Sequence, residues 1–262
     1  MQRSIALLAL TVLIAAPALG YPGGTPGFQT DVAPYCAGCH ASRSEEMLAG
    51  LGPRAQKELP DAKHYPKITA GKGGYEALSE ADRATLIEHL KAVDAASTVT
   101  VDAPASVAAG ETFRVTVSVT GGAGPAVAVA LVDGGHRYLA RPAPSAGWQV
   151  VGAPEIRGPD SAQEWLERRP EPLGRNLAFV NVTGISSDAA AGTWANAQVT
   201  WTLRAPSAAG SYPLAATYWY GTEKASPLGY TTDPVRGKQV RGSYLGNSGR
   251  ILMSSPLSIE VR

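Results

Sequence analysis

The chain has 262 residues and a formal net charge of +1, with 44% hydrophobic and 17% charged residues. This near-neutral balance gives no reason to expect nucleic acid or an acidic membrane surface as a partner. Glycine (29) and proline (20) are abundant, which favours β-rich or loop-rich structure over long helices. Only two cysteines are present, so the chain can form neither a metal site of four cysteines nor a structural disulfide separate from this pair.

The first twenty residues have the pattern of a secretory signal peptide. Arg3 supplies the positive start, residues 5–18 are largely apolar, and Ala18-Leu19-Gly20 resembles a small-x-small cleavage site. The apolar stretch is shorter than the roughly 20 residues that a membrane-spanning helix needs, so we expect cleavage near Gly20 rather than an uncleaved anchor. The sequence therefore predicts a periplasmic or secreted protein with no transmembrane segment in the mature chain.

After the signal peptide, residues 21–95 form a region with few strand signals. Its clearest element is a helix predicted over residues 79–93, where Ser79 and Asp82 resemble a capping box. Leu86, Leu90 and Val93 recur at helical spacing and should face a core. A second, short helix is predicted over residues 42–51, and the polar stretch from residue 60 to residue 75 is predicted to be a loop.

From residue 96 onward the hydrophobic period changes from helical to twofold. Alternating runs predict strands with one buried face, and Gly-containing turns separate them, which indicates a β-sandwich. The strand aromatics, Trp219 among them, are expected in the core or in cross-strand pairs rather than on a binding face. A short helix and a long polar loop are expected to interrupt the strands. The predicted strands contain residues 113–119, 127–131, 199–203, 214–220 and 257–261, the helix residues 161–169 and the loop residues 230–249.

Both cysteines lie in Cys36-Ala37-Gly38-Cys39-His40, a C-x-x-C-H motif typical of c-type haem attachment. Two thiols at this spacing reach the two vinyl groups of one porphyrin. His40 can then ligate the iron from the proximal side, because imidazole suits iron. The alternative is a thioredoxin-like redox pair, which lacks its usual βαβ context here. The motif thus predicts one covalently bound haem c.

Several residues are candidates for the sixth iron ligand. His64 is the first, because it lies 24 residues after His40 in the predicted loop. Met47 is a weaker alternative, since a residue so close to His40 reaches the opposite haem face only by a sharp chain reversal. An open or water-bound position is the third alternative, and a Met/His pair would raise the potential of the iron above that of a bis-His pair. Weaker candidates are His89 on the predicted helix, His136 in a turn and Met253 in the core.

Residues 21–95 resemble a monohaem c-type cytochrome domain of the class I kind. In that family the C-x-x-C-H motif comes early, the distal ligand lies in a loop beside a proline, and a C-terminal helix closes the fold. The resemblance implies Cys36 and Cys39 as thioether residues, His40 as proximal ligand and His64, close to Pro66, as distal ligand. The Gly- and Pro-rich stretch before the motif departs from the family, which usually has a helix there.

The β-region is similar in pattern to immunoglobulin-like and fibronectin type III modules. The predicted fold class is therefore α+β and multidomain, with a small α-helical haem domain (residues 21–95) followed by an all-β sandwich (residues 96–262). Such a likeness describes architecture and assigns no function to the sandwich.

These features predict an exported electron carrier rather than an enzyme, since motifs such as G-x-S-x-G are absent from the sequence. The β-sandwich would dock a redox protein partner. Basic residues between positions 54 and 72 could steer an acidic or membrane-bound partner, although an ordinary solvated loop has the same composition. One alternative is a haem enzyme or gas sensor with an open sixth iron site. Another is an extracellular interaction or adhesion module that carries a haem.

Overall fold

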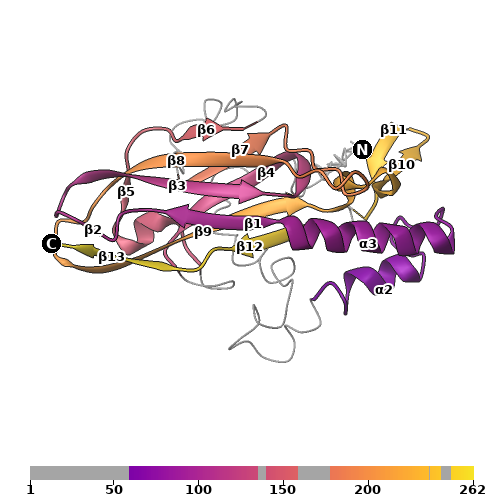
Figure 1. The fold of residues 1–262 in the computed structure, drawn as a ribbon, viewed down its shortest axis with the longest axis horizontal. Helices are drawn as coiled ribbons and strands as arrows, with labels where there is room; N and C mark the ends of the chain where they lie inside the picture. Colours follow the sequence, from indigo (N-terminus) through magenta and orange to yellow (C-terminus); the bar gives the residue numbers. More distant parts are fainter. Residues whose placement is uncertain (1–58, 135–139, 159–177, 236, 243–248) are drawn as a thin grey trace, which may run out of the picture.

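The computed structural model describes residues 59–134, 140–158, 178–235, 237–242 and 249–262. This part of the chain is mostly β-sheet, and its two larger sheets face each other across a common core (Figure 1). The arrangement is compatible with the predicted β-sandwich. Several predictions lie outside the described residues: the signal peptide, Cys36, Cys39, His40, Met47, His136 and the short helices at 42–51 and 161–169.

The first sheet has the clean alternation that the sequence predicts. Along β3 (Thr112–Thr120) and β8 (Asn196–Arg204), every second side chain is buried and the others face outward. The two strands pair antiparallel over their whole length, with Val117 opposite Val199 and Val115 opposite Trp201. This sheet also contains β1 (Thr98–Asp102), β5 (Gln149–Val150) and β6 (Glu155–Arg157), in the order β1-β3-β8 with β5 and β6 both against β8.

The second sheet is built around β9 (Gly210–Gly221), which pairs with three strands. On one side it pairs with β4 (Ala123–Val132), and β4 in turn pairs with β7 (Phe179–Thr183). On the other side it pairs with β12 (Arg250–Met253) and β13 (Leu257–Val261), and β13 has β2 (Ser106–Val107) as a parallel neighbour.

The core lies between the two sheets and contains the inward-facing residues of both. Val117 and Trp201 from the first sheet and Val129 and Tyr218 from the second are completely buried there. The predicted strands at 113–119, 127–131, 199–203, 214–220 and 257–261 are all confirmed, and so is the burial of Trp219. Alternation of apolar and polar residues found these strands because each has at least one face on this core.

The predicted helix at 79–93 is confirmed as α3 (Glu80–Ala96). The Oγ atom of Ser79 accepts a hydrogen bond from the backbone N–H of Asp82 at 3.1 Å, as an N-cap should. Leu86, Leu90 and Val93 are the buried residues of the helix. After Ala96 the chain passes into β1, so α3 continues the line of that strand (Figure 1).

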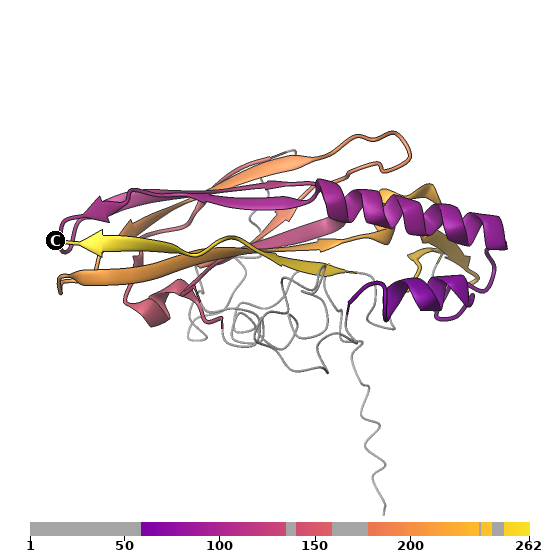
Figure 2. The same cartoon turned by 60° about the horizontal axis from the view of Figure 1, so that its bottom comes forward.

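The loop predicted between residues 60 and 75 is wrong in part, because α2 (His64–Thr69) lies within it. Pro66 is tolerated in the first turn, where the backbone N–H of a residue has no partner inside the helix. The N–H groups of His64 and Tyr65 both donate to the carbonyl of Pro60. Ile68 then packs into a small core that also contains Leu86 of α3, and α2 and α3 lie side by side (Figure 2).

The long loop predicted at 230–249 is also wrong in part. β10 (Tyr230–Asp233) and β11 (Gly237–Val240) form an antiparallel hairpin. The side chain of Asp233 accepts from the N–H of Val235 inside its turn, an interaction that favours chain reversal. Three 3-10 helices complete the described chain: η5 (Ala143–Ala146), η6 (Glu223–Ala225) and η7 (Pro227–Gly229). Within these ranges no helix is long and apolar enough to cross a membrane.

Candidate functional site

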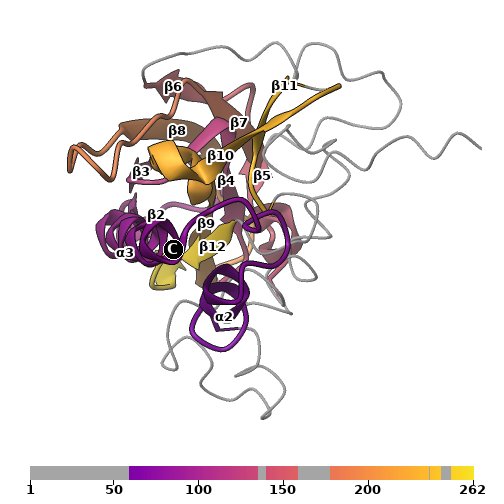
Figure 3. The same ribbon diagram turned by 90° about the vertical axis from the view of Figure 1, so that its right-hand side faces the viewer.

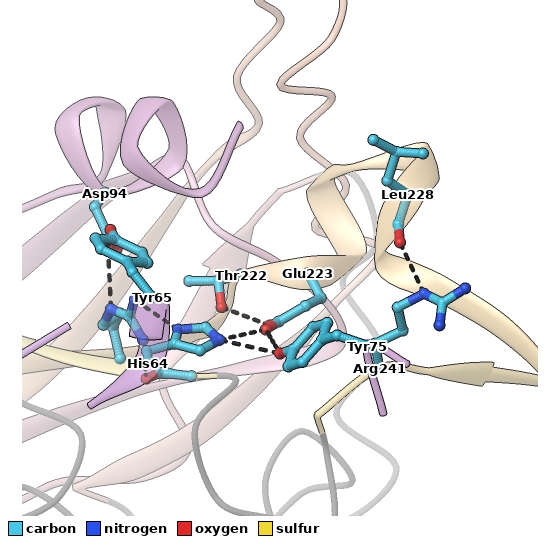
Figure 4. A network of polar contacts seen from close by, with 10 residues as sticks. His64, Tyr65, Tyr75, Asp94, Thr222, Glu223, Leu228 and Arg241 are labelled. Carbon is cyan, nitrogen blue, oxygen red and sulfur yellow. Dashed lines mark hydrogen bonds and ion pairs between the residues drawn. The ribbon is translucent and has the colours of Figure 1, made fainter. Parts of the chain in front are cut away.

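A network of buried polar side chains lies where α2 and α3 meet the ends of β9 and β12 (Figure 4). Its central members, His64, Tyr75, Glu223 and Arg250, are at most 4% exposed. They come from four separate parts of the sequence, so only the tertiary fold brings them together. We call these four residues and Asp94 the junction network.

Glu223, in η6, is completely buried and accepts three hydrogen bonds. Oε1 accepts from the Tyr75 hydroxyl at 2.5 Å and contacts Nε2 of His64 at 2.7 Å. Oε2 accepts from the Thr222 hydroxyl at 2.7 Å. Burial alone would raise the pKa of Glu223, but the interactions with His64, Tyr75 and Thr222 outweigh it and lower the pKa below its ordinary value. Glu223 is therefore a buried carboxylate in its ionised form.

His64 is engaged at both ring nitrogens. Nδ1 lies 3.1 Å from Nη2 of Arg250, and a guanidinium can only donate, so Nδ1 is the acceptor. These partners assign the proton to Nε2, which donates it to Glu223. The side chain is 2% exposed at the start of α2. A residue predicted in a loop is thus a buried member of the junction network.

Arg250, at the start of β12, supplies the positive charge beside the carboxylates of Glu223 and Asp94. Its Nε donates to Oδ2 of Asp94 at 3.1 Å, and its Nη1 donates to the carbonyl of Gly249. Burial opposes the charge, but the nearby acidic groups, Asp94 first among them, raise the pKa of Arg250 above its ordinary value. Asp94 also accepts hydrogen bonds from the hydroxyls of Tyr65 and Tyr220, at 3.3 Å and 2.9 Å.

Arg241 and Gly242 cover the side of the network that contains Tyr75. Arg241 donates to the carbonyls of Leu228 and Gly74, at 3.0 Å and 2.8 Å. Gly242 has a φ of 69°, and a Cβ atom there would overlap the Tyr75 hydroxyl. Burial and the adjacent carboxylate of Glu223 both raise the pKa of Tyr75, so its hydroxyl keeps the proton that it donates.

The network joins segments that are far apart in the chain. Glu223 is 159 residues from His64 and 148 from Tyr75, and Arg250 is 156 residues from Asp94. Buried polar groups are costly unless their hydrogen bonds are made, so such a network favours one relative placement of its elements. The network therefore holds α2 and α3 against the second sheet.

Of the five main site residues predicted, only His64 lies in the described part of the chain, so the contacts here do not test Cys36, Cys39, His40 or Met47. His89 packs as expected for a helix-surface residue, with Nδ1 2.8 Å from the Ser226 hydroxyl. Among the residues that the structure describes, no group of three or more His, Cys, Asp or Glu side chains is arranged to hold a metal ion.

Sequence reasoning missed Glu223, Arg250, Asp94 and Tyr75 as members of a site. Arg250 carries a weak signal, because it directly precedes the apolar run 251–253. Glu223 carries another, because it closely follows the largely apolar run 215–220. Neither signal names a partner, since the contacting residues are more than a hundred positions away.

No protein-family model matches the chain, and a search of curated proteins finds no match. The haem-attachment motif and the contacts of the described residues are therefore the features that indicate a function.

Proposed function

We propose that the protein is an exported c-type cytochrome that binds one haem covalently and transfers single electrons. The observation that carries this proposal is the C-x-x-C-H motif, which contains both cysteines of the chain behind a predicted signal peptide. Cys36 and Cys39 would form the thioethers, and His40 would be the proximal ligand. When bound, the haem supplies reversible one-electron exchange between Fe(II) and Fe(III).

In this proposal the chain consists of a haem domain (residues 21–95) and an immunoglobulin- or fibronectin type III-like sandwich (residues 96–262). The sandwich docks a redox protein partner, which is acidic or membrane-bound. The junction network supports this role, because it ties α2 and α3 to the second sheet and so limits their motion relative to it. A fixed relative placement keeps the distance to a docked partner constant.

A second candidate is a haem protein with an open sixth iron position, able to bind a small ligand. The contacts of His64 favour it, because iron coordination by this residue would require Nε2 to leave Glu223 or Nδ1 to leave Arg250. Either change would leave a buried charged group without one of its hydrogen bonds, which costs about 1–3 kcal/mol. Met47 is the other residue that could close the position.

Covalent haem attachment is tested by producing the full chain with the c-type cytochrome maturation machinery. We expect an intact mass that includes one haem and a haem-stained band after denaturing electrophoresis. The Cys36→Ser/Cys39→Ser double variant should lose both signals, because no thiol remains to form a thioether. Ser42→Ala, in the same segment, is the matched control and should keep both. A wild-type chain that leaves the maturation system without haem would overturn the proposal.

The sixth position is tested by absorption spectroscopy of His64→Ala and His89→Ala, with and without carbon monoxide. If His64 belongs to the junction network and does not bind iron, His64→Ala leaves the absorption spectrum unchanged and lowers the stability of the protein. His89→Ala should change neither the spectrum nor the stability strongly. Rapid formation of a carbon monoxide complex by the reduced wild-type protein would support the open position. Loss of a low-spin spectrum in His64→Ala alone would instead identify His64 as an iron ligand.

A further inference from the structure

The second half of β9 is buried on both of its faces, unlike the strands of the first sheet. Ala216, Tyr218 and Tyr220 face the common core. Thr217 and Trp219 alternate with them and therefore face the other way, yet they are only 0% and 1% exposed. The outer face of the second sheet is thus covered, and it does not face solvent.

The strand register shows how far this outer face extends. Trp219 lies opposite Ile251 of β12 on one side and Ala128 of β4 on the other. In the next row, Thr217 lies opposite Ala130, which lies opposite Phe179 of β7. Directly opposed residues share a face, so two rows of mainly apolar side chains cross four strands. We call this surface the outer face; it is defined by Ala128, Ala130, Phe179, Trp219 and Ile251.

The outer face is tightly covered, although it belongs to none of the described cores. Its five residues are at most 3% exposed. The rings of Trp219 and Phe179 pack edge to face at 5.6 Å, and the indole N–H donates to Thr217 of the same surface. At one end of this face, Val132 and Ala215 pack with Ala140, so the described chain covers that end. None of the five residues takes part in a hydrophobic cluster that the described residues form, so their cover comes from another part of the chain.

The contacts of His64 indicate which segment this is. Arg250, which bonds to the ring of His64, directly precedes Ile251 in β12. The start of α2 therefore lies at the β12 edge of the outer face, where Figure 3 shows α2 beside β12. The chain that precedes α2 arrives at this edge, and it includes residues 21–58.

We propose that residues 21–58, the segment that contains the C-x-x-C-H motif, dock on the outer face. Four strands span about 15 Å, a width that 38 residues cross easily. The segment offers apolar side chains to bury, and only seven of its residues are charged: Asp31, Arg43, Glu45, Glu46, Arg54, Lys57 and Glu58. By contrast, seven of the nineteen residues in 159–177, the segment before β7, are charged, which makes them a poor cover for Trp219 and Phe179.

The inference deepens the proposed function, on which its haem component rests. A haem attached at Cys36 and Cys39 would then belong to a segment that packs on the second sheet. The β-rich part then acts as the platform that carries the haem segment, in addition to docking a partner.

Hydrogen exchange of the full chain, followed by mass spectrometry of peptides, tests the docking. Ala128→Glu places a carboxylate at the centre of the outer face and should speed exchange in residues 21–58 at least tenfold. The matched control is Gln198→Glu, on the exposed face of the first sheet, which should leave that segment unchanged. Amides of β3 and β8 report whether each variant is folded. If Ala128→Glu does not fold, Trp219→Leu replaces it and should give the same change in weaker form.

Faster exchange only in residues 159–177 would assign the outer face to that segment and overturn the proposal, as would unchanged exchange in residues 21–58. The intact mass of each sample reports haem separately. A chain without haem whose residues 21–58 still respond contradicts the proposed function and supports the docking. A chain with haem whose residues 21–58 do not respond contradicts the docking alone.

Discussion

Glu223 illustrates how this chain keeps a full charge inside the protein. Its carboxylate has three donors within hydrogen-bonding distance. Tyr75 and Thr222 stabilise the carboxylate by donating their hydroxyl protons, so both hydroxyls must stay protonated. A carboxylate in this setting is stabilised by its donors and destabilised by burial, and the donors prevail. Each donor is itself buried, so loss of the carboxylate would leave that donor without its acceptor.

Replacing this charge tests whether it stabilises the fold. Glu223→Gln keeps the shape of the side chain but turns its NH₂ group toward a hydroxyl or ring N–H that needs an acceptor. We expect the free energy of unfolding, measured by urea titration, to fall by about 1–3 kcal/mol. Glu88→Gln, at an exposed pair on α3, is the control and should cause no measurable change. Equal effects in the two variants would contradict a special role for Glu223.

The lowered pKa of Glu223 makes a pH-dependent contribution to stability. In the unfolded chain a Glu side chain has a pKa near 4.3, and in the folded protein the value is lower. The folded state therefore gains stability above about pH 4.3 and loses it as the pH falls through the folded pKa. We expect the stability difference between wild type and Glu223→Gln to be constant near neutral pH and to shrink below about pH 4. A difference that grows on acidification would contradict the ionised state.

At the scale of elements, α3 begins at a signal that is local in sequence. Ser79 caps its first turn, where Glu80 and Asp82 also complement the positive end of the helix dipole. The apolar stripe then sets which face is buried. α2 is different, because its six residues would form no stable helix alone and depend on packing against α3 and on Pro60 as acceptor.

The cap of α3 is tested by substitution at Ser79. Ser79→Ala removes the acceptor for the Asp82 N–H and should lower the free energy of unfolding by about 1 kcal/mol. Thr85→Ala, in the exposed interior of the same helix, provides the contrast. Because alanine has the higher helix propensity, that variant should be unchanged or slightly more stable. Thermal unfolding followed by circular dichroism measures both, and loss of stability only in Thr85→Ala would be inconsistent with the cap.

For the whole molecule, the junction network decides how the helices and the sheets behave together. Arg250 connects β12 to α2 through His64 and to α3 through Asp94, which also binds Tyr220 of β9. This set of contacts predicts that α2 and α3 do not open independently of the second sheet. The small apolar core around Ile68 stabilises the helices in addition to these polar contacts.

Arg250→Met should weaken this coupling, since it leaves Asp94, whose side chain is only 12% exposed, without its ion pair. Breaking one partner of a buried pair typically costs about 3–5 kcal/mol. We expect faster hydrogen exchange in α2 and α3 and retained protection in β3 and β8. Glu88→Gln, which removes the acidic partner of an exposed pair on α3, should leave all four elements unchanged. Uniform acceleration across the sheets would mean that the junction and the core unfold as one unit.

Local patterns accounted for a large part of the fold. The strands of the first sheet and α3 follow from alternation, helical spacing and capping, because those signals arise from which face of a single element meets a core. The same reasoning failed for α2 and for the hairpin of β10 and β11, both predicted as loops. Both elements are short and polar, and α2 is stabilised by its packing against α3.

The C-x-x-C-H motif, the capped helix and the alternating strands can be predicted from the sequence, since each depends on residues that are close together in the chain. The role of His64 cannot be predicted in this way. Its partners, Glu223 and Arg250, are 159 and 186 positions away, and no spacing rule connects them. The burial of both faces of β9 cannot be predicted in this way either. Burial and side-chain pairing at these positions depend on contacts between distant segments, so they follow only from the folded structure.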